Sequence, residues 1–317
     1  MNPSTASFIA YDLRPAKQTE RRILLDFLKC ANEAEINISD CRYVGMGGTK
    51  FYDFHLFHRF LGVHQMTSLE RDPELFYRAA FNCPYGFIKV KQKTVGEFLA
   101  SDKETSRTIY WLDYDGGLSS EIIADITALG AKLTAGGFAF VTVNADFPHF
   151  LETKPKETRL EHFQQILGDF SINLNSAQIE KSVFADTVYR VLVAAFKNAF
   201  AARLDGYFHL LFKVQYQDSR PMITVGGCFC SNDQSASIQR RMKVDVPFLL
   251  NKQPYKIDIR KLTLTDSERT LFDVAVTKRR TKSRQATLLL SLGFSAKDLK
   301  SYQDLVRFLP RYHESII

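Results

Sequence analysis

The sequence lacks several features that would assign it to a class directly. It has no run of about 18 apolar residues, the length that a bilayer-spanning helix needs, so we expect no contact with a membrane. Residues 1–7 lack the basic and then apolar stretches of a secretion signal. No internal repeat and no low-complexity tract is found. These absences together favour a cytoplasmic globular protein.

Cysteine is scarce and forms no framework. The five cysteines are an odd number without regular spacing. Cys228 and Cys230 are separated by one residue, and no second pair exists to complete a tetrahedral zinc site. We therefore predict reduced, buried thiols at alternate positions of an apolar strand. His55 and His58 lie three apart on a predicted helix but lack a third ligand, so we predict no metal centre.

Positive charge is in excess, because 42 Lys and Arg residues outnumber 35 Asp and Glu residues and give a net charge of +7. Much of the excess lies in the last third, at Arg240 and Arg241 and across residues 278–284. This pattern favours nucleic acid as a partner of the basic C-terminal region. A solvated helical face would have the same composition, and a protein partner stays open as well.

Strand and helix patterns alternate five times after a first amphipathic helix at residues 19–34, whose apolar face carries Leu24, Phe27 and Ala31. We expect strands at residues 42–44, 64–69, 87–90, 108–112 and 138–143. We expect the intervening helices at residues 51–61, 72–82, 95–100 and 119–129. Such alternation predicts a parallel sheet with right-handed crossovers.

A strong helix pattern at residues 183–204 is followed by two strand patterns, at residues 208–217 and 222–230, joined by a turn-forming segment. The predicted fold is therefore α/β. It is a Rossmann-like, mostly parallel seven-stranded sheet that ends in an antiparallel hairpin. We expect three segments along the chain: an N-terminal helical segment (1–39), a ligand-binding domain (40–230) and a basic, mostly helical extension (231–317).

Glycines follow the first predicted strand. Gly45, Gly47 and Gly48 would let the backbone approach a ligand where any β-carbon would clash, and they precede a helix whose N–H groups would face that ligand. Glu70 ends the second strand, and an acid about 20 residues after such glycines binds ribose hydroxyls in nucleotide-binding folds. The alternative is a surface glutamate paired with Arg71.

Polar residues also end the fourth and fifth predicted strands. Asp113 and Asp115 follow the fourth strand, and Asn144 and Asp146 follow the fifth. Ligands of open α/β sheets bind outside the carboxyl ends of the strands, so these side chains are candidates for the chemistry. The alternative makes the two aspartates turn residues. His149, in the loop after the fifth strand, lies beside the expected substrate mouth.

This order of strands, hairpin and motifs resembles the class I S-adenosylmethionine-dependent methyltransferases. The resemblance covers residues 40–230, and it departs from the family at Tyr43, where an acid is usual, and at Thr49, where a third glycine is usual. It implies a sheet that takes in the last strand of the hairpin and a cofactor, S-adenosylmethionine. The site residues that it implies are Gly45, Met46, Gly47, Gly48, Glu70 and Asp113 for the cofactor, Asp113 and Asp115 for catalysis, and Asn144, Asp146 and His149 for the substrate.

Three functions stay open at this point. The first is methylation of RNA or another polyanion, with the basic tail as docking surface. The second is O-methylation of a small molecule, where Asp113, Asn144 and Asp146 resemble the Mg²⁺ ligands of metal-dependent O-methyltransferases. The third is a non-catalytic protein that keeps the fold. A nicotinamide-dependent dehydrogenase fits less well, because the glycine pattern differs and the hairpin has no place in it. Methylation of the amino groups of DNA bases also loses support, because the fourth strand does not end in Asn/Asp-Pro-Pro-aromatic.

Overall fold

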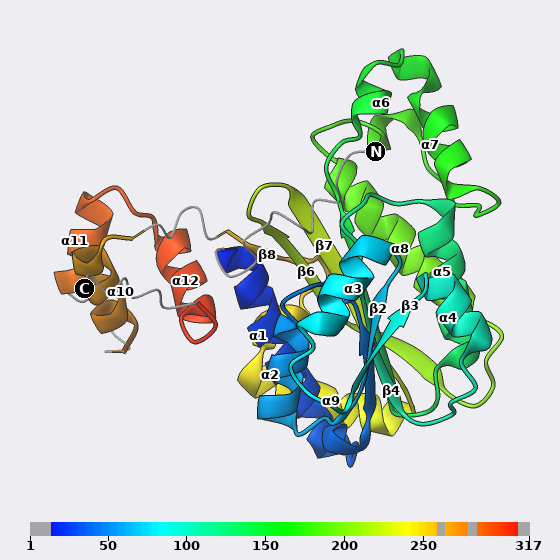
Figure 1. The fold of residues 1–317 in the computed structure, drawn as a ribbon. Coiled ribbons are helices and arrows are strands. Elements are labelled where there is room, and N and C mark those ends of the chain that lie inside the picture. The colour runs from blue at the N-terminus through cyan, green and yellow to red at the C-terminus, as the bar shows by residue number, and fades with distance from the viewer. Residues whose placement is uncertain (1–13, 259–263, 278–283, 310–317) are drawn as a thin grey trace.

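The computed structural model describes residues 14–258, 264–277 and 284–309. One eight-stranded sheet lies at its centre, in the order β3-β2-β1-β4-β5-β7-β6-β8 (Figure 1). The strands are β1 (Arg42–Gly45), β2 (Gln65–Glu70), β3 (Ile88–Gln92), β4 (Thr108–Asp113), β5 (Gly137–Asn144), β6 (Tyr207–Gln217), β7 (Pro221–Cys230) and β8 (Tyr255–Ile257).

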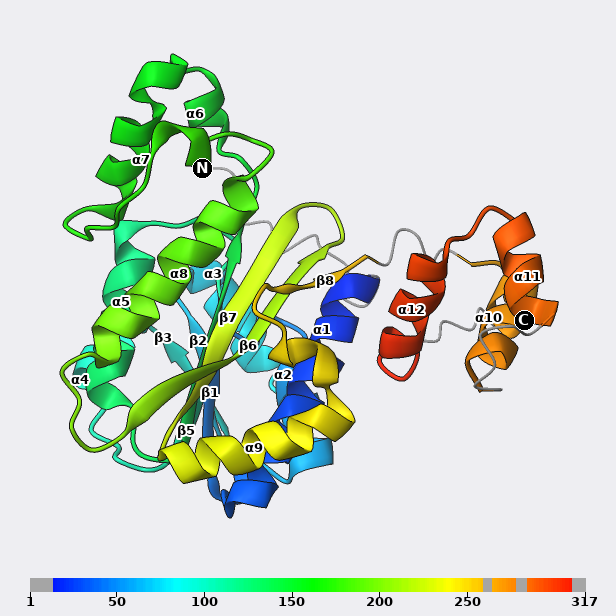
Figure 2. The ribbon, with the colours of Figure 1, turned by 180° about the vertical axis from the view of Figure 1, so that it is seen from behind.

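Helices lie on both faces of this sheet and beyond its ends (Figure 1). They are α1 (Pro15–Lys29), α2 (Tyr52–Leu61), α3 (Pro73–Phe81), α4 (Val95–Ser101), α5 (Ser120–Lys132), α6 (His149–Glu152), α7 (Arg159–Leu167), α8 (Phe184–Phe200), α9 (Asn232–Asp245), α10 (Asp266–Thr277), α11 (Arg284–Ser291) and α12 (Ala296–Leu305). Helices α4, α5 and α8 pack on one face, and α1, α2 and α9 pack on the other (Figures 1 and 2). No described helix is both long and apolar enough to cross a bilayer.

The central strands are parallel and in a register that aligns their carboxyl ends. Gly45 of β1 lies beside Ser68 of β2 on one side and Trp111 of β4 on the other. Asp113 of β4 lies beside Thr142 of β5. Strands β4 and β5 are almost wholly buried, which explains their unbroken apolar sequences. This confirms the predicted Rossmann-like architecture.

The predicted hairpin is present, and its second strand enters the sheet. Strand β7 runs antiparallel to both β5 and β6. A β-carbon at Gly226 would lie 2.2 Å from the carbonyl oxygen of Ala139, so glycine lets β7 approach β5 closely. Cys228 and Cys230 are buried free thiols of β7, as the sequence predicts.

The sheet has one strand more than the sequence predicts, because β8 pairs in parallel with β6. A strand of three residues is too short to show a period of two, so the pattern of the C-terminal region favours helices alone. Helix α9 of the same region contributes Ile238 and Met242 to the main core. Helices α10, α11 and α12 lie to one side of the sheet, beyond α1 (Figure 1).

The first helix is held at its N-terminus by the turn between β6 and β7. No side chain of its own N-cap residue bonds to the first turn of α1. Instead, the carboxylate of Asp218, in the turn between β6 and β7, accepts the backbone N–H groups of Ala16 at 2.9 Å and Lys17 at 3.1 Å. The negative charge of a carboxylate also interacts favourably with the positive end of the helix dipole. This contact therefore fixes where α1 begins against the sheet.

Candidate cofactor and active site

The carboxyl edge of the sheet gathers most of the residues predicted for the site. Gly45, Glu70, Asp113 and Asn144 each end a parallel strand, and those four strands are neighbours in the order β2-β1-β4-β5. The register therefore places these four residues along one edge, as the sequence predicts.

The glycine segment after β1 is packed on one side and open on the other. A β-carbon at Gly45 would lie 2.3 Å from the hydroxyl oxygen of Tyr43, and one at Gly47 would lie 2.8 Å from the ring of Phe51. Both glycines are thus required by the protein's own packing. Gly48 adopts φ of +52° with no atom within 4 Å of its β-carbon position, so the open side of the loop lies there.

Helix α2 begins directly after this loop without a side-chain cap. From α1, the guanidinium of Arg21 donates to the carboxylate of Asp53 in the first turn of α2 and lies 5.4 Å from the ring of Tyr52. The Nη1 atom of Arg21 is buried and has no hydrogen-bond partner among the described residues. A buried donor without a partner is costly, so this group is available to an anionic or oxygen-bearing ligand.

Glu70 lies half-buried at the end of β2. One of its carboxylate oxygens accepts the backbone N–H of Asp72 at 2.9 Å, and Asp72 in turn caps α3. Burial raises the pKa of the Glu70 carboxyl, and the N–H of Asp72 opposes that rise. The structure thus holds this carboxylate in place beside the glycine-bearing strand.

Asp113 is paired with a lysine that the sequence analysis did not select. The ammonium of Lys17 lies 2.8 Å from Asp113 Oδ1 and 2.8 Å from Glu20 Oε2, so one buried cation serves two carboxyl groups. It also lies 4.6 Å from the centre of the Trp111 ring. The Asp113 side chain remains 20% exposed, whereas Lys17 and Glu20 are fully buried. Asp113 therefore lies at the edge of the sheet, with its Oδ1 atom held by the buried ammonium of Lys17.

Burial and charge oppose each other in this cluster. Burial by itself would lower the pKa of Lys17, but the charges of Asp113 and Glu20 outweigh it and raise that pKa well above its ordinary value. Burial raises the pKa of Glu20, and the charge of Lys17 counteracts it. The hydroxyl of Thr224 also donates to Glu20. The buried charges are thus compensated within the protein.

Asp115 and the two residues after β5 have different surroundings. The surface of Asp115 is exposed to solvent, but protein atoms packed around its carboxyl partly desolvate it. This desolvation, and then the charge of Asp113, raises the pKa of the carboxyl. Asn144 Oδ1 accepts the N–H of Asp146 at 2.8 Å, and Asp146 Oδ1 accepts the N–H of Phe147 at 3.0 Å. These local bonds shape the loop after β5, and the predicted substrate role of both residues stays a prediction.

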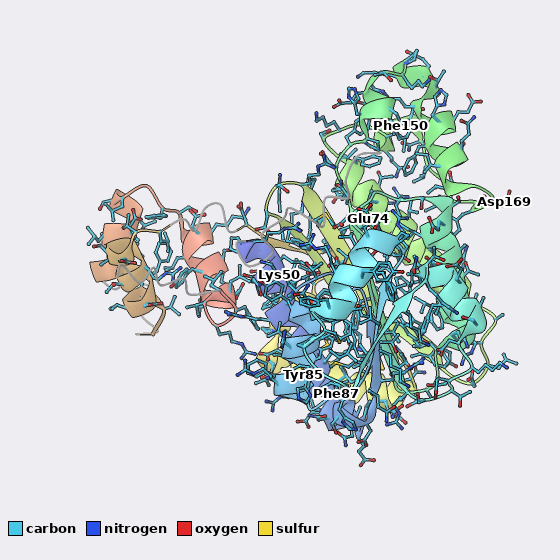
Figure 3. The ribbon with its side chains drawn as sticks, in the orientation of Figure 1. Lys50, Glu74, Tyr85, Phe87, Phe150 and Asp169 are labelled. Atoms are coloured by element: carbon cyan, nitrogen blue, oxygen red, sulfur yellow. The ribbon has the colours of Figure 1, made fainter. Side chains whose placement is uncertain are left out.

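His149 begins helix α6 on a lobe that α6 and α7 form above the sheet (Figure 1). Its side chain is 88% exposed and lies 3.2 Å from Glu152 of the same helix. Phe150, labelled in Figure 3, lies on the same lobe. No described contact links His149 to the strand ends, so its role in substrate binding also stays a prediction.

The sequence did carry a signal for the residues of α1. The apolar face with Leu24, Phe27 and Ala31 continues backward, at intervals of three and four, to Lys17, Glu20 and Arg21. Charged residues at core-facing positions need buried partners, and in an α/β fold such partners lie at the ends of strands.

No three His, Cys, Asp or Glu side chains gather into a metal-binding group within the described part of the chain. His55 and His58 instead form separate hydrogen bonds, with the Tyr85 hydroxyl and the Val63 carbonyl oxygen, each at 3.0 Å.

Comparison with known proteins identifies the family of the chain. Residues 9–317 match the family described as "Putative O-methyltransferase". The chain belongs to this family. It is an S-adenosylmethionine-dependent methyltransferase, which confirms the resemblance seen in the motifs.

Two solved structures are similar to the chain at low sequence identity. The N-methyltransferase NodS from Bradyrhizobium japonicum is 11% identical, with 64% of this chain and 95% of that chain covered and a TM-score of 0.37. An rRNA methylase from Streptococcus thermophilus is 11% identical, with 66% of this chain and 95% of that chain covered and a TM-score of 0.35. No curated protein matches the methyltransferase.

Proposed function

We propose that this methyltransferase binds S-adenosylmethionine at the carboxyl edge of β1, β2 and β4 and transfers its methyl group to an oxygen atom of the acceptor. The observation that carries the proposal is the open side of the loop at Gly48, which leads into the uncapped N-terminus of α2. The description of the family supports oxygen as the accepting atom.

The residues at this edge fit the groups of the cofactor. The carboxylate of Glu70 would accept hydrogen bonds from the ribose hydroxyls. The N–H groups at the start of α2 and the unpartnered Nη1 of Arg21 would face the carboxylate of the amino-acid portion. The free oxygen of Asp113 would accept from its ammonium group, while Lys17 holds the other oxygen.

When bound, the cofactor supplies a sulfonium methyl group, which an acceptor oxygen attacks in line with the departing sulfur. The chain's own residues orient the two partners and take the acceptor proton. Asp115 is the group that we assign to the proton, because it is exposed beside Asp113 and its raised pKa makes it a stronger base than an ordinary aspartate. Asp113 is held by Lys17 and serves to position the cofactor.

Calorimetric titration with S-adenosylhomocysteine tests this site. Glu70→Ala should weaken binding at least about tenfold, because a hydrogen bond to a charged group contributes about 1.5–3 kcal/mol. Glu74→Ala is the matched control, since Glu74 is exposed on the neighbouring α3 and is labelled in Figure 3. Equal affinity of the two variants would remove Glu70 from the site, and no binding by the unmodified protein would overturn the proposal.

A further inference from the structure

A second candidate site lies on the face of β3 that points away from the main core and from the buried charges of α1. A groove of about 750 Å³ runs along this strand and reaches the first residues of β1 and β2. Its far wall is the end of α4 and the segment that leads into β4, residues 101–105. Phe87, which directly precedes β3 and is labelled in Figure 3, also lines the groove.

Lysines dominate the lining of this groove. Strand alternation places Lys89 and Lys91 on the same face of β3, because Ile88 and Val90 point into the core on the opposite face. Lys93 follows directly, and Lys103 lies on the opposite wall. Strand β3 is the edge of the sheet, and α4 packs mainly on the neighbouring strands, so Lys89 is exposed while Lys91 and Lys93 are half-buried beside α4.

No ion pair with a carboxylate is described for any of the four lysines, although the charge of Lys93 contributes to lowering the pKa of Glu97 in α4. The Lys93 ammonium donates to the Ser101 hydroxyl at 2.7 Å, and the Lys91 ammonium lies 5.1 Å from the centre of the Phe98 ring. Both contacts leave the positive charge uncompensated. The groove therefore presents a positive potential to solvent.

The acid at the floor of the groove does not neutralise the lysines. Asp102 is buried and is held by two bonds from the Arg42 guanidinium, at 3.0 and 2.6 Å. Its charge is thus compensated by arginine. Glu104 is the remaining acid of the lining, and it is exposed at the rim.

We propose that this groove binds the phosphodiester backbone of single-stranded RNA. Lysine is a mobile point charge suited to phosphate, and a row of lysines at strand spacing, about 7 Å between alternate residues, can follow a chain of phosphates. A protein-binding surface would require a buried apolar centre, whereas only Met66 and Phe87 of the lining are large and apolar. The choice of RNA over DNA rests on the proposed function, because the ribose 2′-hydroxyl of RNA offers an oxygen atom that can accept a methyl group and DNA lacks this hydroxyl.

The lysine groove is separate from the basic C-terminal region, whose role as a nucleic-acid surface stays a prediction. Arg241 is one of the basic residues that the sequence analysis names in that region. It donates to Asp245 at 2.5 Å and lies 3.8 Å from Glu33, so nearby carboxylates compensate its charge. Residues 278–283 lie outside the described part of the chain.

The test is fluorescence anisotropy of a labelled oligouridylate of about 16 nucleotides, measured across a range of salt concentrations. The double variant Lys89→Ala/Lys91→Ala should bind at least about tenfold more weakly, and the magnitude of the slope of log K against log salt should fall by about 1.4, at about 0.7 for each phosphate contact with a single strand. The matched control is Lys252→Ala/Lys256→Ala, which removes the same charge from exposed positions at the β8 end of the sheet.

Equal losses in both variants would overturn the proposal, because net charge alone would then explain binding. Displacement of the RNA by polyglutamate at equal charge concentration would assign the groove to an acidic protein instead. If the unmodified protein binds no RNA and the double variant self-associates, the proposal is overturned. The lysines would then serve to prevent the exposed edge strand from pairing with another molecule. Equal affinity for oligothymidylate would overturn the preference for RNA and leave phosphate recognition intact.

The groove and the cofactor site can fail separately. The groove variant should retain its affinity for S-adenosylhomocysteine. Lys91 is the register partner of Leu69, next to Glu70, but no described side-chain contact links Lys89 or Lys91 to Glu70 or to the glycine loop. A protein that binds RNA through these lysines but binds no S-adenosylhomocysteine would support the groove and refute the cofactor site.

Discussion

The carboxyl edge near β4 and the groove along β3 handle charge in opposite ways. At the edge, the ammonium of Lys17 is fully buried between two carboxyl groups, and the guanidinium of Arg21 is bound to Asp53. In the groove, Lys89 is exposed and has no acidic partner among the described residues. The first arrangement holds parts of the fold together, and the second leaves charge free for an external partner. Stability measurements should therefore separate the two regions.

The largest expected effect comes from Lys17→Met. Removal of the buried cation leaves Asp113 and Glu20 without compensation, so the free energy of unfolding should fall by about 3–5 kcal/mol. Urea denaturation measures this loss. Lys29→Met on the same helix is the control, because Lys29 is 43% exposed and its pair with Asp26 contributes about 0–1 kcal/mol. Similar losses in the two variants would show that the buried cluster is not a cornerstone of the fold.

Gly45→Ala should have the next largest effect. The new β-carbon would lie 2.3 Å from the Tyr43 hydroxyl, and the Tyr43 ring is fully enclosed by the core. Overpacking of this kind costs about 1–3 kcal/mol of stability, measurable by urea denaturation. Gly116→Ala, where no atom lies within 4 Å of the β-carbon position, should change stability by less than about 0.5 kcal/mol. A neutral Gly45→Ala variant would mean that the glycine serves the ligand alone.

Asp125 should give a smaller, pH-dependent effect, because it has a neutral partner where Asp113 has a cation. Burial raises its pKa from 3.8 to about 6, although it accepts a hydrogen bond from the Tyr114 hydroxyl at 2.6 Å. The native state therefore holds this proton more tightly than the unfolded chain. The stabilisation is complete below about pH 4 and is lost as the pH rises through about 6.

Asp125→Asn keeps the acceptor oxygen and removes the titration. Between about pH 4 and about pH 6, the unmodified protein should lose about 1–2 kcal/mol more than the variant. Urea midpoints measured across this range give the difference. Parallel pH profiles would show that Asp125 ionises normally in the native state.

The smallest expected effect is that of Lys89→Ala/Lys91→Ala on stability. Because these lysines have no ionic partner in the described structure, the free energy of unfolding should change by less than about 0.5 kcal/mol. Urea denaturation of the variant used for RNA binding provides this value. A loss above about 1 kcal/mol would place the lysines in the fold itself and remove the contrast with Lys17.

The features that the sequence predicted correctly are those with a local pattern. The order of strands, the hairpin and the clustering of Gly45, Glu70 and Asp113 at one edge follow from periodicity and from the rule that parallel strands share an edge. The partners of these residues depend on tertiary contacts. Lys17 reaches Asp113 from a helix 96 positions earlier in the chain, and no spacing in the sequence specifies that distance.

The lysine groove was missed for a related reason. The predicted third strand ends at residue 90, whereas β3 continues to Gln92. The predicted strand therefore leaves out Lys91 and does not place it on the same face as Lys89. The opposite wall, with Lys103, belongs to a different connection and meets β3 only in the folded chain. Composition instead drew attention to the C-terminal region, where Arg241 already has acidic partners.

The cap that Asp218 provides for α1 has a consequence for synthesis on the ribosome. The contact spans 202 positions, so α1 leaves the exit tunnel long before the residue that fixes its first turn has been translated. Until then Lys17 and Glu20 stay hydrated, because their burial requires Thr224 and Tyr216 of the late hairpin. The nascent domain therefore completes the buried charge cluster behind Asp113 only after β6 and β7 emerge, and a chain truncated before them would leave Lys17 and Glu20 without these partners.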